Sequence, residues 1–273
     1  MRKSSAQRTL SEAVRLEAIG QHSGKLCRLS IKPASVDTGI VVNGLPLRLE
    51  NVKAAAGFTS MGNLLTVEHV LSCLHGLGIT NAVIESESAE TPIMDGSSLP
   101  LAELIKSVEQ DAPRKVLFVR KPVEFEDKSA RVRLLPGDEP IYSVEIDYSD
   151  TPAIGREKME FALTPEAYMK EIAPARTFAR MKDVEFLHSQ GKALGASLAT
   201  GIGVENDKIL NPEGLRLKDE FVRHKILDAI GDMFTTGFPL IGRYESEKGG
   251  HFHNHELLVK LMSDPDNYEI AEG

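Results

Sequence analysis

The chain contains few cysteines, no excess of basic residues and no long hydrophobic run. Cys27 and Cys73 are the only cysteines among 273 residues, too few for a disulfide framework, so the sequence predicts a reducing compartment and a cytoplasmic protein. The formal net charge of −8 argues against nucleic-acid binding, which requires a basic footprint.

Apolar stretches are short throughout the sequence. None approaches the ~20 residues that span a bilayer, so we expect no transmembrane segment. Residues 1–5 are basic but lead into no apolar segment, which argues against a secretory signal. The composition, 41% hydrophobic and 26% charged, is typical of a globular protein of one large or two medium domains.

The first part of the chain predicts strands and two helices. Apolar residues at helical spacing predict a helix at 66–77, with Thr66 as its N-cap, and a second helix is expected at 99–108. Asn43-Gly44 is a strong signal for a two-residue hairpin turn. We expect strands at 10–19, 26–31, 40–42, 45–49 and 82–85.

Residues 110–114 have the composition of a linker, and they divide the chain into expected domains of residues 1–112 and 113–273. The second part predicts strands at 116–119, 130–135, 143–148, 198–204 and 208–210. It predicts helices from Thr164 and at 184–190, 219–235 and 257–262. Each half thus mixes strands with helices, which favours an α+β fold over a doubly wound sheet.

His224 and Asp228 lie four residues apart in the expected helix 219–235. Residues at this spacing share one helix face, so the imidazole and the carboxylate can hold one divalent metal ion. A catalytic zinc usually takes three protein ligands and keeps one position for water. A helix-face pair worth about 0.2–0.5 kcal/mol is the structural alternative.

Glu68 and His69 lie in the first turn of the expected helix 66–77, outside its apolar stripe. His69 could supply a third ligand, and Glu68 could take a proton from the attacking water, as in H-E-x-x-H hydrolases although the spacing differs. Alternatively, Glu68 complements the helix dipole and His69 is a surface residue.

His251 follows two glycines and precedes two more histidines, His253 and His255. Flexible glycines would let His251 reach into a cleft and act as a general acid near neutral pH. The alternatives are a loop histidine without a role and a weak second metal site.

Three further residues could take part in chemistry. Lys225 adjoins a candidate ligand and could stabilise an oxyanion, Thr177 could donate a hydrogen bond, and Asp232 could orient a histidine. Each also has an ordinary interpretation, as a solvated helix lysine, a strand or turn threonine, and an exposed helix carboxylate.

Several short motifs follow one another in the order of a known family. Together they closely resemble the UDP-3-O-acyl-N-acetylglucosamine deacetylases, zinc amidases of lipid A biosynthesis, over nearly the whole chain. The segments that carry the resemblance are 20–25, 66–69, 92–97, 175–178, 210–216, 219–232 and 250–251.

This resemblance implies a fold and an activity. Such proteins have two α+β domains of similar make-up, each a mostly antiparallel sheet with helices, and the helices pack between the two sheets. Their active site lies at the domain junction and removes acetate from a UDP-linked acylated amino sugar. We expect a monomer.

The resemblance also implies a metal site and its surroundings. Zinc, or alternatively iron(II), would be held by His69, His224 and Asp228. The other implied residues are Glu68 as general base, His251 as general acid, Asp232 as the carboxylate that positions it, Thr177 and Lys225 beside the scissile acetamide, and Tyr148 and Phe178 against the substrate.

Some features depart from the family pattern. Segment 53–63 is shorter than the usual insert beside the cleft, and His253 and His255 match no family role. Two alternatives therefore stay open: a deacetylase of a different N-acetyl sugar, and a non-catalytic sugar-nucleotide or acyl-chain binding protein on the same fold.

Overall fold

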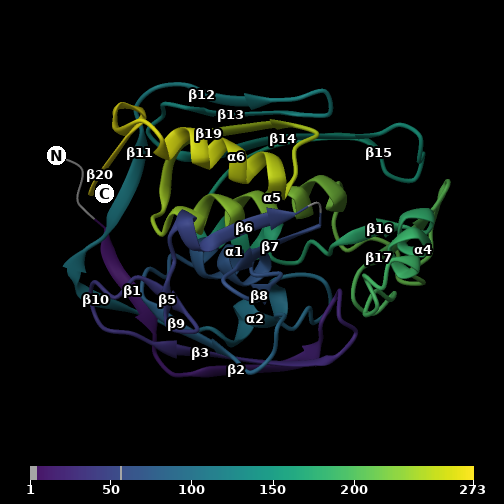
Figure 1. Cartoon of the computed structure of the whole chain (residues 1–273), viewed down its shortest axis with the longest axis horizontal. Helices are drawn as coiled ribbons and strands as arrows, with labels where there is room; N and C mark the ends of the chain where they lie inside the picture. The colour runs from purple at the N-terminus through teal and green to yellow at the C-terminus, as the bar shows by residue number, and fades with distance from the viewer. Residues whose placement is uncertain (1–4, 56) are drawn as a thin grey trace.

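Two sheets enclose a layer of helices in the computed structural model, which describes residues 5–55 and 57–273 (Figure 1). The basic start of the chain thus lies, apart from Ser5, outside the described residues. The helices between the sheets are α1 (Glu68–Gly76), α2 (Leu99–Leu104), α5 (Glu220–Met233) and α6 (His251–Met262).

The sheet of the N-terminal half has the strand order β2-β3-β9-β4-β5 and is antiparallel except between β4 and β9. Along β3, Cys27, Leu29 and Ile31 are buried and alternate with more exposed residues, as in a sheet with one face on the core. The strands are β2 (Val14–Ile19), β3 (Leu26–Pro33), β4 (Ile40–Val42), β5 (Leu45–Pro46) and β9 (Ala82–Ser86).

The sheet of the C-terminal half is built around β19 (Leu240–Glu247), which pairs with β11, β13 and β14. Tyr244 of β19 is buried, and its side chain points toward the helix layer, where its hydroxyl donates to Asn254 of α6. The other strands are β11 (Lys115–Val119), β12 (Val123–Glu126), β13 (Arg131–Leu135), β14 (Pro140–Tyr148), β15 (Gly155–Ala162) and β20 (Tyr268–Glu272).

Helices α1 and α5 come from different halves of the chain and pack against each other at Gly231. A Cβ atom on Gly231 would lie 2.1 Å from the carbonyl oxygen of Glu68, so a side chain here would collide with the backbone of α1. Glycine therefore allows the first turn of α1 to approach α5 closely. This contact places Glu68 and His69 beside the C-terminal half of α5.

Small elements surround this core. The strands β16 to β18 and the helix α4 form a lobe at one end of the molecule (Figure 1). The small strands are β1 (Ala6–Leu10), β6 (Val52–Ala55), β7 (Phe58–Met61), β8 (Leu64–Leu65), β10 (Ser107–Pro113), β16 (Phe178–Arg180), β17 (Ile202–Glu205) and β18 (Lys208–Ile209). The short helices are η1 (Leu49–Asn51), α3 (Pro165–Ala167), η2 (Tyr168–Ile172), α4 (Met181–Ser189), η3 (Phe234–Thr236) and η4 (Pro265–Asn267).

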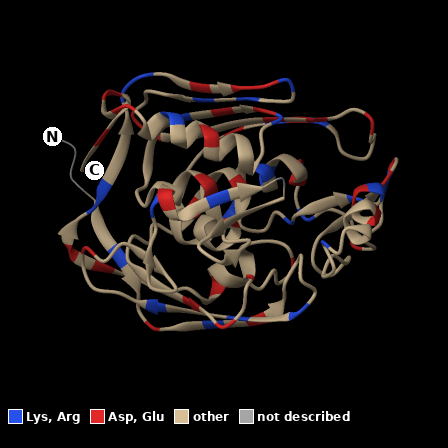
Figure 2. Cartoon of the chain, viewed as in Figure 1, with Lys and Arg blue, Asp and Glu red and all other residues tan. Residues whose placement is uncertain are grey.

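Charged residues of both signs alternate along the outer strands of both sheets (Figure 2). On the C-terminal sheet they form cross-strand ion pairs, such as Arg243 Nη2 to Glu160 Oε2 at 2.6 Å. Among the described residues, no helix combines the length and apolar character needed to cross a membrane.

The predicted α+β class, with helices between two sheets, is confirmed. Several predicted boundaries are wrong because pairing between distant segments decides them. The expected strand 10–19 is divided by residues 11–13 into β1 and β2, and the expected strand 198–204 begins only at Ile202. The expected helix 257–262 begins already at His251.

Residues 110–114 are not a free linker. Most of them belong to β10, which pairs antiparallel with β1, and the expected helix 99–108 accordingly ends at Leu104. Tertiary pairing has here overridden a local composition typical of loops. The division into residues 1–112 and 113–273 stays a prediction.

Thr66 does not cap α1. The backbone of Thr66 is left-handed, with a φ of 61°, and its hydroxyl lies 3.3 Å from Glu90 Oε1. Val67 occupies the N-cap position of α1 and makes no side-chain hydrogen bond there. The first turn of α1 is instead fixed from outside, where the Thr59 N–H donates to the Glu68 carboxylate at 2.9 Å.

Candidate metal centre and active site

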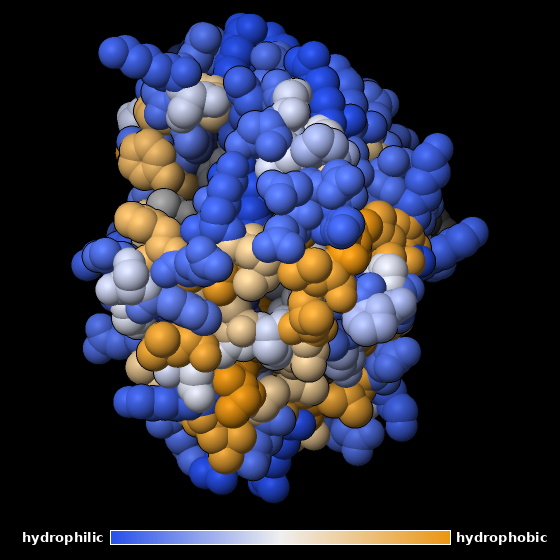
Figure 3. All heavy atoms as spheres, turned by 90° about the vertical axis from the view of Figure 1, so that its right-hand side faces the viewer, coloured by the Kyte–Doolittle hydropathy of each residue, from blue (hydrophilic) through white to orange (hydrophobic). Residues whose placement is uncertain are grey.

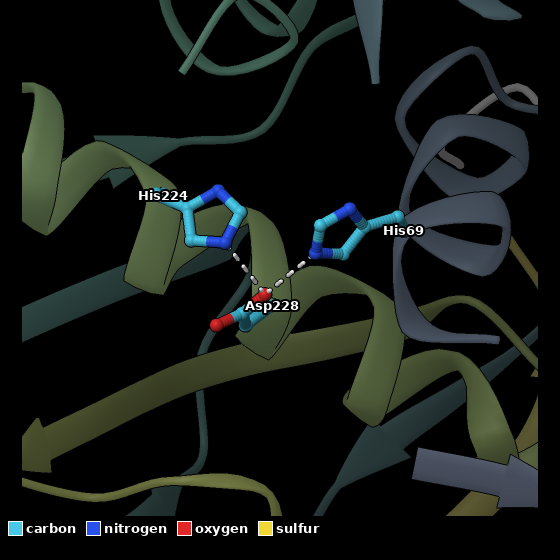
Figure 4. A group of neighbouring side chains, drawn as sticks. All are labelled: His69, His224 and Asp228. Atoms are coloured by element: carbon cyan, nitrogen blue, oxygen red, sulfur yellow. Dashed lines mark ion pairs between the residues drawn. The ribbon is translucent and has the colours of Figure 1, made fainter. Parts of the chain in front are cut away.

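Three side chains from two helices converge on one point (Figure 4). His69 comes from α1, and His224 and Asp228 come from α5. The Nε2 atoms of His69 and His224 lie 3.5 Å and 3.4 Å from the same oxygen, Asp228 Oδ1. One ligand atom from each residue lies within 4.8 Å of the other two. The structure thus brings together the pair on α5 and the third candidate ligand.

This donor set fits a divalent metal ion. Ligand atoms ~2.1 Å from a tetrahedral zinc lie roughly 3.4 Å apart, close to the separations found here. Asp228 Oδ1 is buried and has no hydrogen-bond partner among the described residues, which is costly unless a cation satisfies it.

The contacts of His224 prepare its Nε2 for a metal. Its Nδ1 lies 3.1 Å from the carbonyl oxygen of Ala175, so Nδ1 carries the proton and Nε2 keeps its lone pair. Burial lowers the pKa of His224 to about 4, against the opposing influence of Asp228. The ring is therefore neutral at physiological pH, as a metal ligand must be.

Lys225 holds the other oxygen of Asp228. Its Nζ donates to Asp228 Oδ2 at 2.8 Å. Burial alone would raise the pKa of the Asp228 carboxyl, but Lys225 and His224 hold it well below its usual range. Asp228 is thus a carboxylate whose Oδ1 is left to bind a cation together with the two histidines. The alternative of a solvated Lys225 is wrong, since its side chain is 20% exposed and paired.

Glu68 is the first residue of α1 and is 2% exposed. Its carboxylate accepts the Thr59 N–H, and burial raises its pKa, although His251 and His69 oppose that shift. A carboxylate with a raised pKa is a better proton acceptor than an exposed one. Glu68 lines the same cavity as the three donor residues.

His251 and Asp232 form a buried pair. His251 Nδ1 lies 2.8 Å from Asp232 Oδ2, and its Nε2 lies 4.0 Å from Asp228 Oδ2. Burial alone would lower the pKa of His251, but the Asp232 carboxylate outweighs it and raises this pKa to about 9. The ring is therefore an imidazolium at neutral pH, with Nε2 directed toward the donor cluster.

Two expectations about this pair are corrected. His251 does not sit in a flexible loop: it is the first residue of α6 and is 8% exposed, because the preceding glycines lead directly into that helix. Asp232 is not an exposed helix carboxylate, because α5 lies in the middle layer and buries it.

Sequence reasoning missed two residues that hold Asp232. Its Oδ1 accepts from Thr59 Oγ1 at 2.7 Å, and its Oδ2 accepts from Asn254 Nδ2 at 2.8 Å. Asn254 lies three residues after His251, on the same face as the buried Leu257 and Leu258. Helical spacing would have indicated Asn254 if the helix had been extended back to His251.

A cavity of about 660 Å³ connects these groups. Thr177 lies in its wall, held in place by a hydrogen bond from its N–H to the Gly96 carbonyl at 2.7 Å. Tyr148 and Phe178 also line it, with ring centroids 5.6 Å apart at 76°, and Arg180 Cζ lies 5.4 Å from the Tyr148 centroid. The structure therefore places the predicted site residues around a common space, except Asp232, which contacts that space only through His251.

An adjoining, mainly apolar cavity of about 220 Å³ shares Thr177 and Phe178 with the first. Figure 3 shows apolar residues gathered around a hollow on the side of the molecule that carries α4. Residues 19–26 and 186–198 contact each other through backbone hydrogen bonds. The exposed large apolar side chains of these two segments are Ile19, Leu26, Phe186, Leu194 and Leu198. An apolar chain could lie in this cavity beside a polar group at the donor cluster.

The chain is similar in sequence to known deacetylases over most of its length. The family model for UDP-3-O-acyl N-acetylglycosamine deacetylase (LpxC) matches residues 7–263. Proteins named UDP-3-O-acyl-N-acetylglucosamine deacetylase from Pseudomonas entomophila (strain L48) and Sulfurovum sp. (strain NBC37-1) are 42% and 41% identical to the chain. Each alignment covers 97% of this chain, and 93% and 94% of those proteins, respectively. A third protein of that name, from Hahella chejuensis (strain KCTC 2396), is 41% identical over 97% of this chain and 93% of its own length.

Proposed function

The chain belongs to the UDP-3-O-acyl N-acetylglycosamine deacetylase family, and we propose that it uses zinc to hydrolyse the acetamide of UDP-3-O-acyl-N-acetylglucosamine. It is an amide hydrolase of lipid A biosynthesis and a metalloenzyme. The convergence of His69, His224 and Asp228 beside Glu68 in one cavity carries the proposal.

The metal would be held by His69, His224 and Asp228. When bound, zinc supplies a Lewis acid that polarises the amide carbonyl and makes water more acidic. Iron(II) suits the same donors, so the choice between the two metals depends on affinity and availability. Lys225 keeps Asp228 charged and oriented whichever metal binds.

Proton transfer is assigned to two residues that line the same cavity, Glu68 and His251. Glu68 takes a proton from the attacking water, since its buried carboxylate has a raised pKa. His251, protonated at neutral pH and oriented by Asp232, gives its proton to the departing sugar nitrogen. Amide nitrogen is a poor leaving group, so hydrolysis needs this acid as well as the base. Acetate and a free 2-amino sugar nucleotide result.

Further cavity residues would position the substrate. Thr177 and Lys225 would donate to the oxygen of the acetamide as it gains charge. Tyr148 and Phe178 would contact the nucleotide or the sugar through their rings. The apolar cavity behind Thr177 and Phe178 would take the 3-O-acyl chain, because it can bury methylenes next to the reacting amide.

Substrate selectivity tests this assignment. Acetate release should be measured with zinc supplied, for UDP-3-O-acyl-N-acetylglucosamine and for UDP-N-acetylglucosamine without the acyl chain. Burying four methylenes at about 0.8 kcal/mol each predicts a kcat/KM that is roughly 200-fold higher for the acylated substrate. Equal turnover of both would favour a deacetylase of another N-acetyl sugar. Binding of the acylated substrate without acetate release would favour a non-catalytic binding protein.

A further inference from the structure

The helix that carries His251 begins without a conventional side-chain cap. Its N-cap is Gly250, which has no side chain, and Lys248 shortly before it has a left-handed φ of 61°. Ser, Thr, Asp or Asn usually fix a helix start by accepting one of the first free N–H groups. Here the glycines before His251 cannot do so.

His253, the third residue of the helix, holds its start by a different contact. Its Nδ1 accepts the N–H of Gly250 at 3.3 Å. A ring nitrogen that accepts carries no proton, so the proton of the neutral ring is on Nε2. Nε2 faces the turn between β12 and β13, 3.2 Å from Ser129 Oγ and 3.3 Å from Asp127 Oδ2.

The β12–β13 turn is arranged to receive this ring. Asp127 Oδ1 accepts the N–H and the hydroxyl of Ser129, both at 2.7 Å, and the N–H of Ala130 at 3.0 Å. These bonds lower the pKa of Asp127 to about 2, and the largest contribution comes from the Ser129 hydroxyl. The other carboxylate oxygen, Oδ2, faces His253. We call the contact between His253, Asp127 and Ser129 the His253 clasp.

The His253 clasp complements the contact between His251 and Asp232. Asp232 holds the His251 ring from α5, whereas the clasp fixes the backbone at Gly250, directly before His251. All three clasp residues line the same cavity as His251. A small rotation of the first turn of α6 would move His251 Nε2 relative to the donor cluster on the other helices.

We propose that His253 is a positioning residue for His251: by joining the start of α6 to the β12–β13 turn, it fixes the direction from which the acid reaches the leaving nitrogen. The proposal rests on the proposed function for the role of His251. It gives His253 a task that the deacetylation chemistry alone does not assign.

Kinetics of three variants test this. His253→Leu removes the polar contacts of both ring nitrogens, whereas His253→Gln keeps an acceptor for Gly250 and a donor for Asp127. His255→Leu is the matched control, since His255 lies on the same helix and its buried Nδ1 has no partner in the described part of the chain. We expect kcat for acetate release to fall about 10-fold in His253→Leu with little change in KM, because a small misplacement of the acid slows chemistry more than binding. His253→Gln should recover most of the loss, and His255→Leu should show no such loss.

A second measurement does not depend on turnover. Amide hydrogen exchange at Gly250 should be at least several-fold faster in His253→Leu than in wild type or His255→Leu, because the N–H loses its acceptor. Equal exchange and equal kcat in the two leucine variants would overturn the proposal, and so would a loss confined to KM, which would make His253 a substrate contact. Absence of acetate release from the wild type would instead contradict the proposed function. The hydrogen-exchange rate at Gly250 would still show whether His253 holds the start of α6.

Discussion

Replacing Glu68 by glutamine is expected to lower kcat for acetate release by about 10²–10⁴-fold, the usual contribution of a general base. Glutamine has the same size and can still accept the Thr59 N–H, so the fold around α1 should persist. It cannot take a proton from water. Steady-state acetate release with zinc supplied measures the effect.

Metal binding provides the control for this variant. Glu68→Gln leaves the three donor residues unchanged, so the purified variant should still bind about one zinc ion per chain. Glu50→Gln, which removes a carboxylate that is 72% exposed, should keep the wild-type rate. A rate for Glu68→Gln within a few-fold of wild type would show that another group is the base.

Replacing Gly231 by alanine should damage both stability and metal binding. The added Cβ would lie 2.1 Å from the Glu68 carbonyl oxygen and 2.9 Å from its carbonyl carbon, and these backbone atoms cannot rotate away. Helices α1 and α5 must therefore separate, which moves His69 away from His224 and Asp228. We expect the free energy of unfolding to fall by about 1–3 kcal/mol or more. We also expect zinc affinity to fall at least 10-fold, because the three donors would no longer fit one ion.

Chemical denaturation and zinc titration of the variant measure these two effects. Gly137→Ala is the matched control, because a Cβ there would meet its nearest atom, Gly242 Cα, at an ordinary 3.4 Å. Wild-type stability and zinc affinity in Gly231→Ala would mean that the two helices do not need this close contact.

Local spacing predicted much of the site. The i, i+4 relation of His224 and Asp228 survives folding because α5 is a regular helix at that point. Glu68 and His69 could be proposed because they follow one another at a helix start. The family resemblance linked these segments, but no periodicity could show that α1 and α5 meet at Gly231. That contact joins residues more than 160 positions apart and depends on the packing of the whole middle layer.

Errors in the predicted elements have the same origin. Residues 110–114 have the composition of a linker, yet most of them belong to β10, which pairs with β1. The glycines before His251 suggested mobility, yet α6 begins there because Asp232 and the His253 clasp hold its first turn. Thr59 was missed because its hydrogen bond to Asp232 joins residues 173 positions apart in the sequence.

Zinc-dependent acetate release would show whether His69, His224 and Asp228 form a catalytic metal site. Wild-type protein should be stripped of metal with a chelator and assayed with UDP-3-O-acyl-N-acetylglucosamine. The assay is then repeated after about one equivalent of zinc is added. The His224→Ala variant is treated in the same way. We expect no acetate release from the stripped protein, recovery on addition of zinc to the wild type, and no recovery in His224→Ala. Undiminished activity in the stripped wild type, or equal recovery in both proteins, would contradict a metal site shared by α1 and α5.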